Sequence, residues 1–146
     1  MHLFTYGCLM IPEAMERITG RCFRHEEAVL RGYVRLRVKH RMDAALIRFP
    51  DTHTEGRVYF DVDAEALGRI DRFEGALYRR TSVNIETSAG EWVEAETYVF
   101  RLPERKRLTA SAWDPDDFRS RHLERFLHQH PPCPGDHAAG SPPPGQ

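Results

Sequence analysis

The stretch from Leu30 to Lys39 constrains the fold of this 146-residue chain most strongly, because apolar and basic residues alternate along it. Val34, Leu36 and Val38 occupy one side, and basic residues occupy the other. This period of two predicts a half-buried strand, which needs a sheet and a core on its apolar side. Shorter stretches predict further strands at Leu3 to Tyr6, Ala44 to Phe49, Arg57 to Val62, Tyr78 to Thr87 and Glu91 to Leu102.

Three short helices are predicted between and after these strands. The first spans Ile11 to Ile18, with a proline near its first position. The second begins at a capping Asp63 and ends at Gly75, and the third begins at a capping Asp114. The residues of the third helix that we expect to face the core are Phe118, Leu123, Phe126 and Leu127.

The order of these elements predicts the fold class. Residues 50–56 have loop composition, Ser88 to Gly90 is a hairpin turn, and Arg101 to Arg107 is interpreted as a solvated loop. A mixed α+β domain over residues 1–130, with a curved or barrel-like sheet, fits this order better than a doubly wound parallel sheet. Residues 131–146 are rich in proline and glycine, and we predict a disordered tail there.

Composition excludes several classes of partner. The 21 basic and 22 acidic residues are interspersed and give a net charge of −1, so no surface for nucleic acid or an anionic membrane is indicated. No apolar run is long enough to span a bilayer, and no signal peptide begins the sequence. The balanced charge favours a small-molecule ligand. The three cysteines lack paired spacing, so we interpret them as reduced thiols and predict a cytoplasmic protein.

Two places carry residues that suit chemistry. The loop Tyr6-Gly7-Cys8-Leu9 joins the first strand to the first helix, where free backbone N–H groups can bind an anion. Glu74 lies at the end of the second helix, where the helix dipole opposes a carboxylate. That field and any burial would raise the pKa of Glu74 toward the range of a general base.

Taken together, these residues resemble the γ-glutamylcyclotransferase-like proteins, and most closely the bacterial members and the γ-glutamylamine cyclotransferases. The loop resembles their Tyr-Gly-(Ser/Thr)-Leu signature. The resemblance spans about residues 3 to 127, and its order and spacing are more specific than any single motif. The other stretches that carry it are Gly56-Arg57-Val58-Tyr59, Asp71-Arg72-Phe73-Glu74-Gly75, Tyr78-Arg79-Arg80, Ala95-Glu96-Thr97-Tyr98-Val99 and Trp113 with its helix.

The resemblance implies a small barrel flanked by helices, with a cavity at the loop. It implies that the substrate's α-amine attacks its own γ-carbonyl, which releases 5-oxoproline and a free amine without metal or cofactor. Glu74 would be the acid–base residue. Tyr6, Gly7, Cys8 and Leu9 would hold the γ-glutamyl group, and Tyr78 would line the pocket.

The sequence departs from the family pattern in two places, and other functions stay open. Cys8 stands where the family has Ser or Thr, and residues 41–44 stand where many relatives carry a Tyr-Pro segment, which affects the leaving-group pocket. One alternative is a hydrolase with Cys8 as nucleophile and a histidine base. Another is a non-catalytic module that binds a metabolite or a protein partner on the same fold.

Four histidines and a cysteine lie near the C-terminal end, and residues of these types can bind a metal. Their spacing matches no standard zinc pattern, so we interpret them as solvated side chains. These residues are His122, His128, His130, His137 and Cys133.

Overall fold

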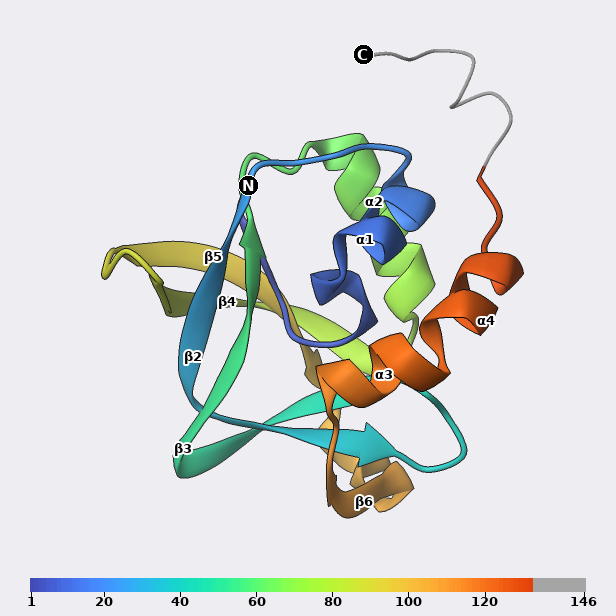
Figure 1. The fold of residues 1–146 in the computed structure, drawn as a ribbon. Helices are drawn as coiled ribbons and strands as arrows, with labels where there is room; N and C mark the ends of the chain where they lie inside the picture. Colours follow the sequence, from blue (N-terminus) through green and yellow to red (C-terminus); the bar gives the residue numbers. More distant parts are fainter. Residues whose placement is uncertain (133–146) are drawn as a thin grey trace.

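The alternating stretch forms the second half of β2 (His25–Val38), which pairs with three other strands. The computed structural model describes residues 1–132 (Figure 1). The other strands are β1 (Leu3–Thr5), β3 (Ala44–Tyr59), β4 (Tyr78–Thr87), β5 (Trp92–Phe100) and β6 (Leu108–Ala112). The helices are α1 (Pro12–Thr19), α2 (Ala64–Glu74), α3 (Pro115–Arg121) and α4 (Leu123–Gln129), with 3₁₀ turns η1 (Cys8–Met10) and η2 (Leu102–Arg107).

The sheet closes into a barrel, as the sequence predicted. Its strand order is β3-β1-β5-β4-β2-β6. An additional pairing between β2 and β3 closes the five strands β3, β1, β5, β4 and β2 into a ring, and β6 pairs with β2 outside this ring. β1 pairs antiparallel with β3 and parallel with β5, so the barrel is mixed. The α-helices gather on one side of it (Figure 1). This architecture confirms the α+β barrel-like fold.

One predicted loop, residues 50–56, is wrong, because β3 continues through it. The β2–β3 register runs from Arg31 opposite His53 to Tyr33 opposite Arg48, so the four residues 49–52 bulge out opposite Gly32. Beyond the bulge the pairing resumes. Thr54 is buried and its hydroxyl donates to the Tyr33 carbonyl at 3.0 Å, which holds this polar segment in the sheet.

The C-terminal third also differs from prediction. Residues 102–107 form η2, with no buried side chain, and the unpredicted β6 follows it and pairs with β2. The single late helix is two helices that meet at His122. Side chains eight residues apart on a straight helix point about 80° apart. The break at His122 instead lets Phe118 and Phe126 enter one core cluster, with ring centroids 5.9 Å apart.

The barrel interior depends on one glycine. Phe4, Leu46, Val58 and Ile85 fill it and are completely buried. A Cβ at Gly56 would lie 2.2 Å from the Thr5 carbonyl oxygen, so no side chain fits where β3 pairs with the end of β1. Gly56 therefore sets how closely the two strands approach.

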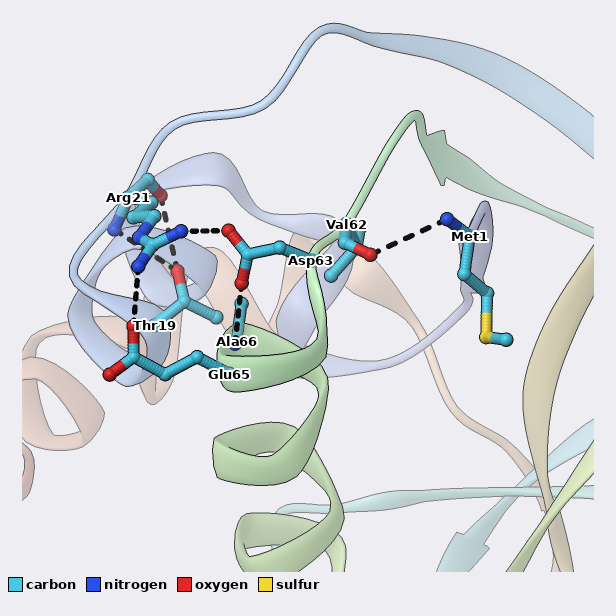
Figure 2. Close-up of polar contacts among 7 residues, drawn as sticks. All are labelled: Met1, Thr19, Arg21, Val62, Asp63, Glu65 and Ala66. Carbon is cyan, nitrogen blue, oxygen red and sulfur yellow. Dashed lines mark hydrogen bonds and ion pairs between the residues drawn. The ribbon is translucent and has the colours of Figure 1, made fainter.

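Polar contacts join the end of α1 to the start of α2 (Figure 2). The Asp63 carboxylate accepts from the Ala66 N–H at 2.8 Å, which confirms the predicted cap. The Arg21 guanidinium forms ion pairs with both Asp63 and Glu65, and the Arg21 N–H donates to the Thr19 hydroxyl. These contacts fix the N-terminal end of α2, and hence the direction in which its other end points.

No helix within residues 1–132 is long and apolar enough to cross a membrane. Most of the predicted tail, residues 133–146, lies outside the described part of the chain.

Candidate active site

A pocket of about 330 Å³ opens between the β1–η1 loop, the end of α2 and the turn joining β2 to β3. Its volume suits a small metabolite. All six residues predicted for the site line it: Tyr6, Gly7, Cys8, Leu9, Glu74 and Tyr78. The rest of the described lining is Phe4, Thr5, Arg41, Met42, Asp43, Ala44, Phe73, Tyr98, Phe126, Gln129 and His130.

Glu74 is the last residue of α2, and the chain turns away directly after it. Gly75 has a φ of 79°, which favours glycine, and its N–H donates to the Asp71 carbonyl at 3.1 Å. Burial is the main cause that raises the pKa of Glu74 to about 8, and the negative charge of Asp43 adds to it. Within residues 1–132 no hydrogen bond or ion pair holds the Glu74 carboxyl, so it is free to act on a ligand.

The loop that lines the pocket together with Glu74 contains backbone N–H groups without a partner among the described residues. The N–H groups of Met10 and Ile11 close the 3₁₀ turn. In the described chain, those of Cys8 and Leu9 have no acceptor. The Tyr6 carbonyl accepts from the Arg35 guanidinium at 2.8 Å, which fixes the start of the loop.

Three tyrosines tie the pocket walls together. The Tyr6 hydroxyl donates to the Tyr98 carbonyl at 2.6 Å, and the Tyr78 hydroxyl donates to the Ala44 carbonyl at 2.8 Å. The Tyr98 hydroxyl donates to the Asp71 carboxylate, one turn before Glu74 on α2. Burial raises the pKa of the Tyr6 and Tyr78 hydroxyls, so both stay protonated donors at neutral pH.

The environment of Cys8 disfavours the nucleophile hypothesis. Burial raises the pKa of its thiol well above the ordinary value, and the carboxylates of Asp43 and Glu74 raise it further. A nucleophilic cysteine requires the opposite, because the thiolate is the reactive form. The Cys8 sulfur instead lies 3.9 Å from an oxygen of Asp43, as a weak donor.

Sequence reasoning missed several residues of this pocket. The sequence indicates Arg41 and Asp43 only as part of a segment that departs from the family pattern, and Tyr98 only as part of a strand that resembles the family. The wall formed by Phe73, Phe126 and His130 joins α2 to α4, with ring centroids 4.6 to 5.7 Å apart. No local motif could have found it, because its members are brought together only by the tertiary fold.

No group of three or more histidine, cysteine or acidic side chains is placed to hold a metal ion within residues 1–132. Cys133 and His137, which belonged to the candidate set near the C-terminal end, lie outside these residues.

A family model and several known proteins match the part of the chain that contains most of this pocket. A family model described as "Gamma-glutamyl cyclotransferase, AIG2-like" matches residues 3–115. AIG2-like protein C of Arabidopsis thaliana is 30% identical over 126 residues, which cover 86% of this chain and 73% of that protein. A solution structure of an Arabidopsis thaliana protein, 28% identical, has a TM-score of 0.68 and covers 88% of this chain and 78% of its own. A structure described as gamma-glutamyl cyclotransferase shares the fold, with a TM-score of 0.60 at 14% identity and coverage of 91% and 89%.

Proposed function

This chain belongs to the gamma-glutamyl cyclotransferase, AIG2-like family, and from that premise we propose that it cleaves a γ-glutamyl amide to 5-oxoproline and a free amine. The observation that carries the proposal is the Glu74 carboxyl, whose pKa is raised to about 8, in one pocket with the unpaired N–H groups of Cys8 and Leu9. A proton acceptor and oxyanion donors are the two components that an intramolecular acyl transfer needs.

The first requirement of the reaction is orientation. The α-amine and the γ-carbonyl belong to one substrate, so the protein must bend the glutamyl chain until the nitrogen lies against the carbonyl carbon. The closed barrel and the tyrosine contacts give the pocket a fixed shape for this task. Tyr6, Gly7 and Leu9 contribute the loop, and Tyr78 the facing wall.

The second requirement is proton transfer. Glu74 takes a proton from the α-ammonium, and the resulting amine attacks the γ-carbonyl carbon. The N–H groups of Cys8 and Leu9 stabilise the oxyanion that forms. The carbon–nitrogen bond to the leaving group then breaks. In total the α-nitrogen loses two protons and the leaving nitrogen gains two, departing as an ammonium ion. A carboxyl group with a pKa near 8 can accept and return each proton.

The replacement of Ser or Thr by Cys8 is compatible with this mechanism. A thiol donates weakly, but the proposed oxyanion contacts come from the main chain and do not depend on the side chain. Cys8 and Cys22 are free thiols, and a reducing cytoplasm stays our prediction for the compartment.

The test is a panel of γ-glutamyl amines and γ-glutamyl amino acids, with 5-oxoproline measured by mass spectrometry. We expect product from the wild type and a loss of at least about 100-fold in the Glu74→Gln variant. Full turnover by that variant would refute the role of Glu74. A folded wild type that binds members of the panel and forms no 5-oxoproline would instead support the non-catalytic binding module.

A further inference from the structure

The pocket contains an ion pair that the proposed mechanism does not use. Arg41 and Asp43 lie on the turn between β2 and β3, with Nη2 and Oδ2 2.6 Å apart. In the described lining, Arg41 is the only arginine or lysine, and Asp43 is the only carboxylate besides Glu74. His130 also lines the pocket, but burial lowers its pKa, so it is mostly neutral at pH 7.

The two oxygens of Asp43 have different neighbours. Oδ2 faces Arg41, whereas Oδ1 has only the Cys8 thiol, at 3.9 Å, as a donor within residues 1–132. A thiol at that distance is a weak donor, so Oδ1 keeps capacity for a stronger one. The Asp43 side chain is 24% exposed, which leaves it partly desolvated and favours binding of a cationic group from a ligand.

Contacts on both sides hold the turn in place. The Trp113 indole N–H donates to the Met42 carbonyl at 2.9 Å, and the Tyr78 hydroxyl donates to the Ala44 carbonyl at 2.8 Å. In Figure 1 the turn after β2 runs beneath α3, which follows Trp113 in the chain. The Asp43 backbone is therefore fixed between two buried aromatic residues, and its carboxylate needs little reordering to bind.

We propose that Arg41 and Asp43 form the subsite for the zwitterionic α-amino-acid end of the substrate, with Asp43 accepting from the α-ammonium and Arg41 donating to the α-carboxylate. This assignment rests on the proposed function, because a γ-glutamyl group carries both charges on one carbon. The neighbouring opposite charges of the protein match that pair. Asp43 and Glu74 line the same pocket, and the negative charge of Asp43 raises the pKa of Glu74, so an ammonium bound at Asp43 shares the pocket with the group that takes its proton.

Three butylamides separate the contact made by Arg41 from the contact made by Asp43. The butylamide end of each ligand is uncharged, so any charge-dependent effect comes from the other end. γ-Glutamyl butylamide has both head charges. 4-Aminobutyryl butylamide lacks the α-carboxylate and cyclises to 2-pyrrolidinone. Glutaryl butylamide lacks the α-amine and can only inhibit. A variant that removes one contact should affect only the ligands that carry the matching charge.

We expect Arg41→Gln to raise KM for γ-glutamyl butylamide by about 10-fold or more, because the contact is with a charged group, and to leave KM for 4-aminobutyryl butylamide within about 2-fold. Asp43→Asn should raise KM for γ-glutamyl butylamide similarly and leave the inhibition constant of glutaryl butylamide nearly unchanged. Arg107→Gln is the matched control, since Arg107 forms an exposed ion pair with Glu104 outside the pocket lining. Thermal unfolding checks that each variant is folded.

Two results would overturn the subsite. One is an equal change for γ-glutamyl and 4-aminobutyryl butylamide in Arg41→Gln. The other is no change in either variant while the wild type turns over. A selective effect of Arg41→Gln on γ-glutamyl amino acids, absent with the butylamides, would place Arg41 at the leaving group and also refute the assignment.

Binding to the Glu74→Gln protein, measured by calorimetry, separates the subsite from the reaction. γ-Glutamyl butylamide should bind to the Glu74→Gln protein, and adding Arg41→Gln to that protein should weaken the affinity by about 10-fold. This result would support the subsite even where the wild type forms no 5-oxoproline. If the wild type forms 5-oxoproline but neither Arg41→Gln nor Asp43→Asn changes the affinity for γ-glutamyl butylamide, the subsite is refuted and the proposed function stands.

Discussion

Replacing Glu74 by glutamine should stabilise the protein at neutral pH while it removes activity. The carboxyl has an ordinary pKa of 4.5 in the unfolded chain and a pKa of about 8 in the folded protein. Well below its ordinary pKa, under about pH 3, the carboxyl is protonated in both states and does not affect stability. Between pH 4.5 and 8 the unfolded chain releases the proton first, so stability falls as the pH rises. Above pH 8 both states are ionised and the cost is constant.

The size of the effect follows from these two values. At pH 7 the difference in proton binding destabilises the folded state by about 3 kcal/mol, and at pH 4 by only about 0.2 kcal/mol. Glutamine does not titrate, so Glu74→Gln should gain up to about 3 kcal/mol at pH 7 relative to its effect at pH 4. Comparing the two pH values cancels any change in packing that the substitution itself causes.

Urea unfolding measures this difference directly. Trp113 is 5% exposed and its fluorescence reports unfolding, whereas Trp92 is already 63% exposed. Glu94→Gln, at an exposed position of β5, is the matched control for removing one carboxylate. If the stability gain of Glu74→Gln were equal at pH 4 and pH 7 within about 0.5 kcal/mol, the argument that Glu74 is strongly perturbed would be refuted.

Three further predictions concern single residues. Gly56→Ala should destabilise the fold by about 3 kcal/mol or more in thermal unfolding, because its Cβ would meet the Thr5 carbonyl; a near-neutral result would contradict the close approach of β3 to β1 at Gly56. Cys8→Ser should keep 5-oxoproline formation within about 10-fold of wild type, whereas its abolition would revive the nucleophile hypothesis. Tyr98→Phe should lower stability by about 1–2 kcal/mol through the lost bond to Asp71, measured by urea unfolding, and an unchanged midpoint would show that this bond contributes nothing.

The sequence predicted the barrel and the core of the site because both depend on local patterns. Alternation identified β2, and the capping Asp63 with the terminal Gly75 bounded α2 closely. Those bounds place Glu74 at a helix end. The resemblance then linked Glu74 to the β1–η1 loop, and the structure brings the two into one pocket.

What the sequence could not predict depends on contacts between distant residues. Residues 50–56 read as a loop because their composition is polar, yet the bond from buried Thr54 to Tyr33 holds them in the sheet. The break at His122 follows from burying Phe118 and Phe126 together. Asp43 lies in a turn with no motif of its own, and only its position near Glu74 gives it an electrostatic effect there.

Glu74 lies on a helix, whereas Arg41 and Asp43 lie on a turn between two strands, and this difference affects how readily each can be substituted in evolution. Glu74 belongs to a helix that is anchored at its far end by Arg21, so its position is tied to the stability of the whole domain. Arg41 and Asp43 belong to a turn between strands, held through backbone carbonyls whose bonds do not depend on side-chain identity. Substitutions of Arg41 or Asp43 can therefore change the charge of the pocket at little cost to folding. The charges on this side of the pocket can thus vary in evolution while the barrel and α2 keep their structure.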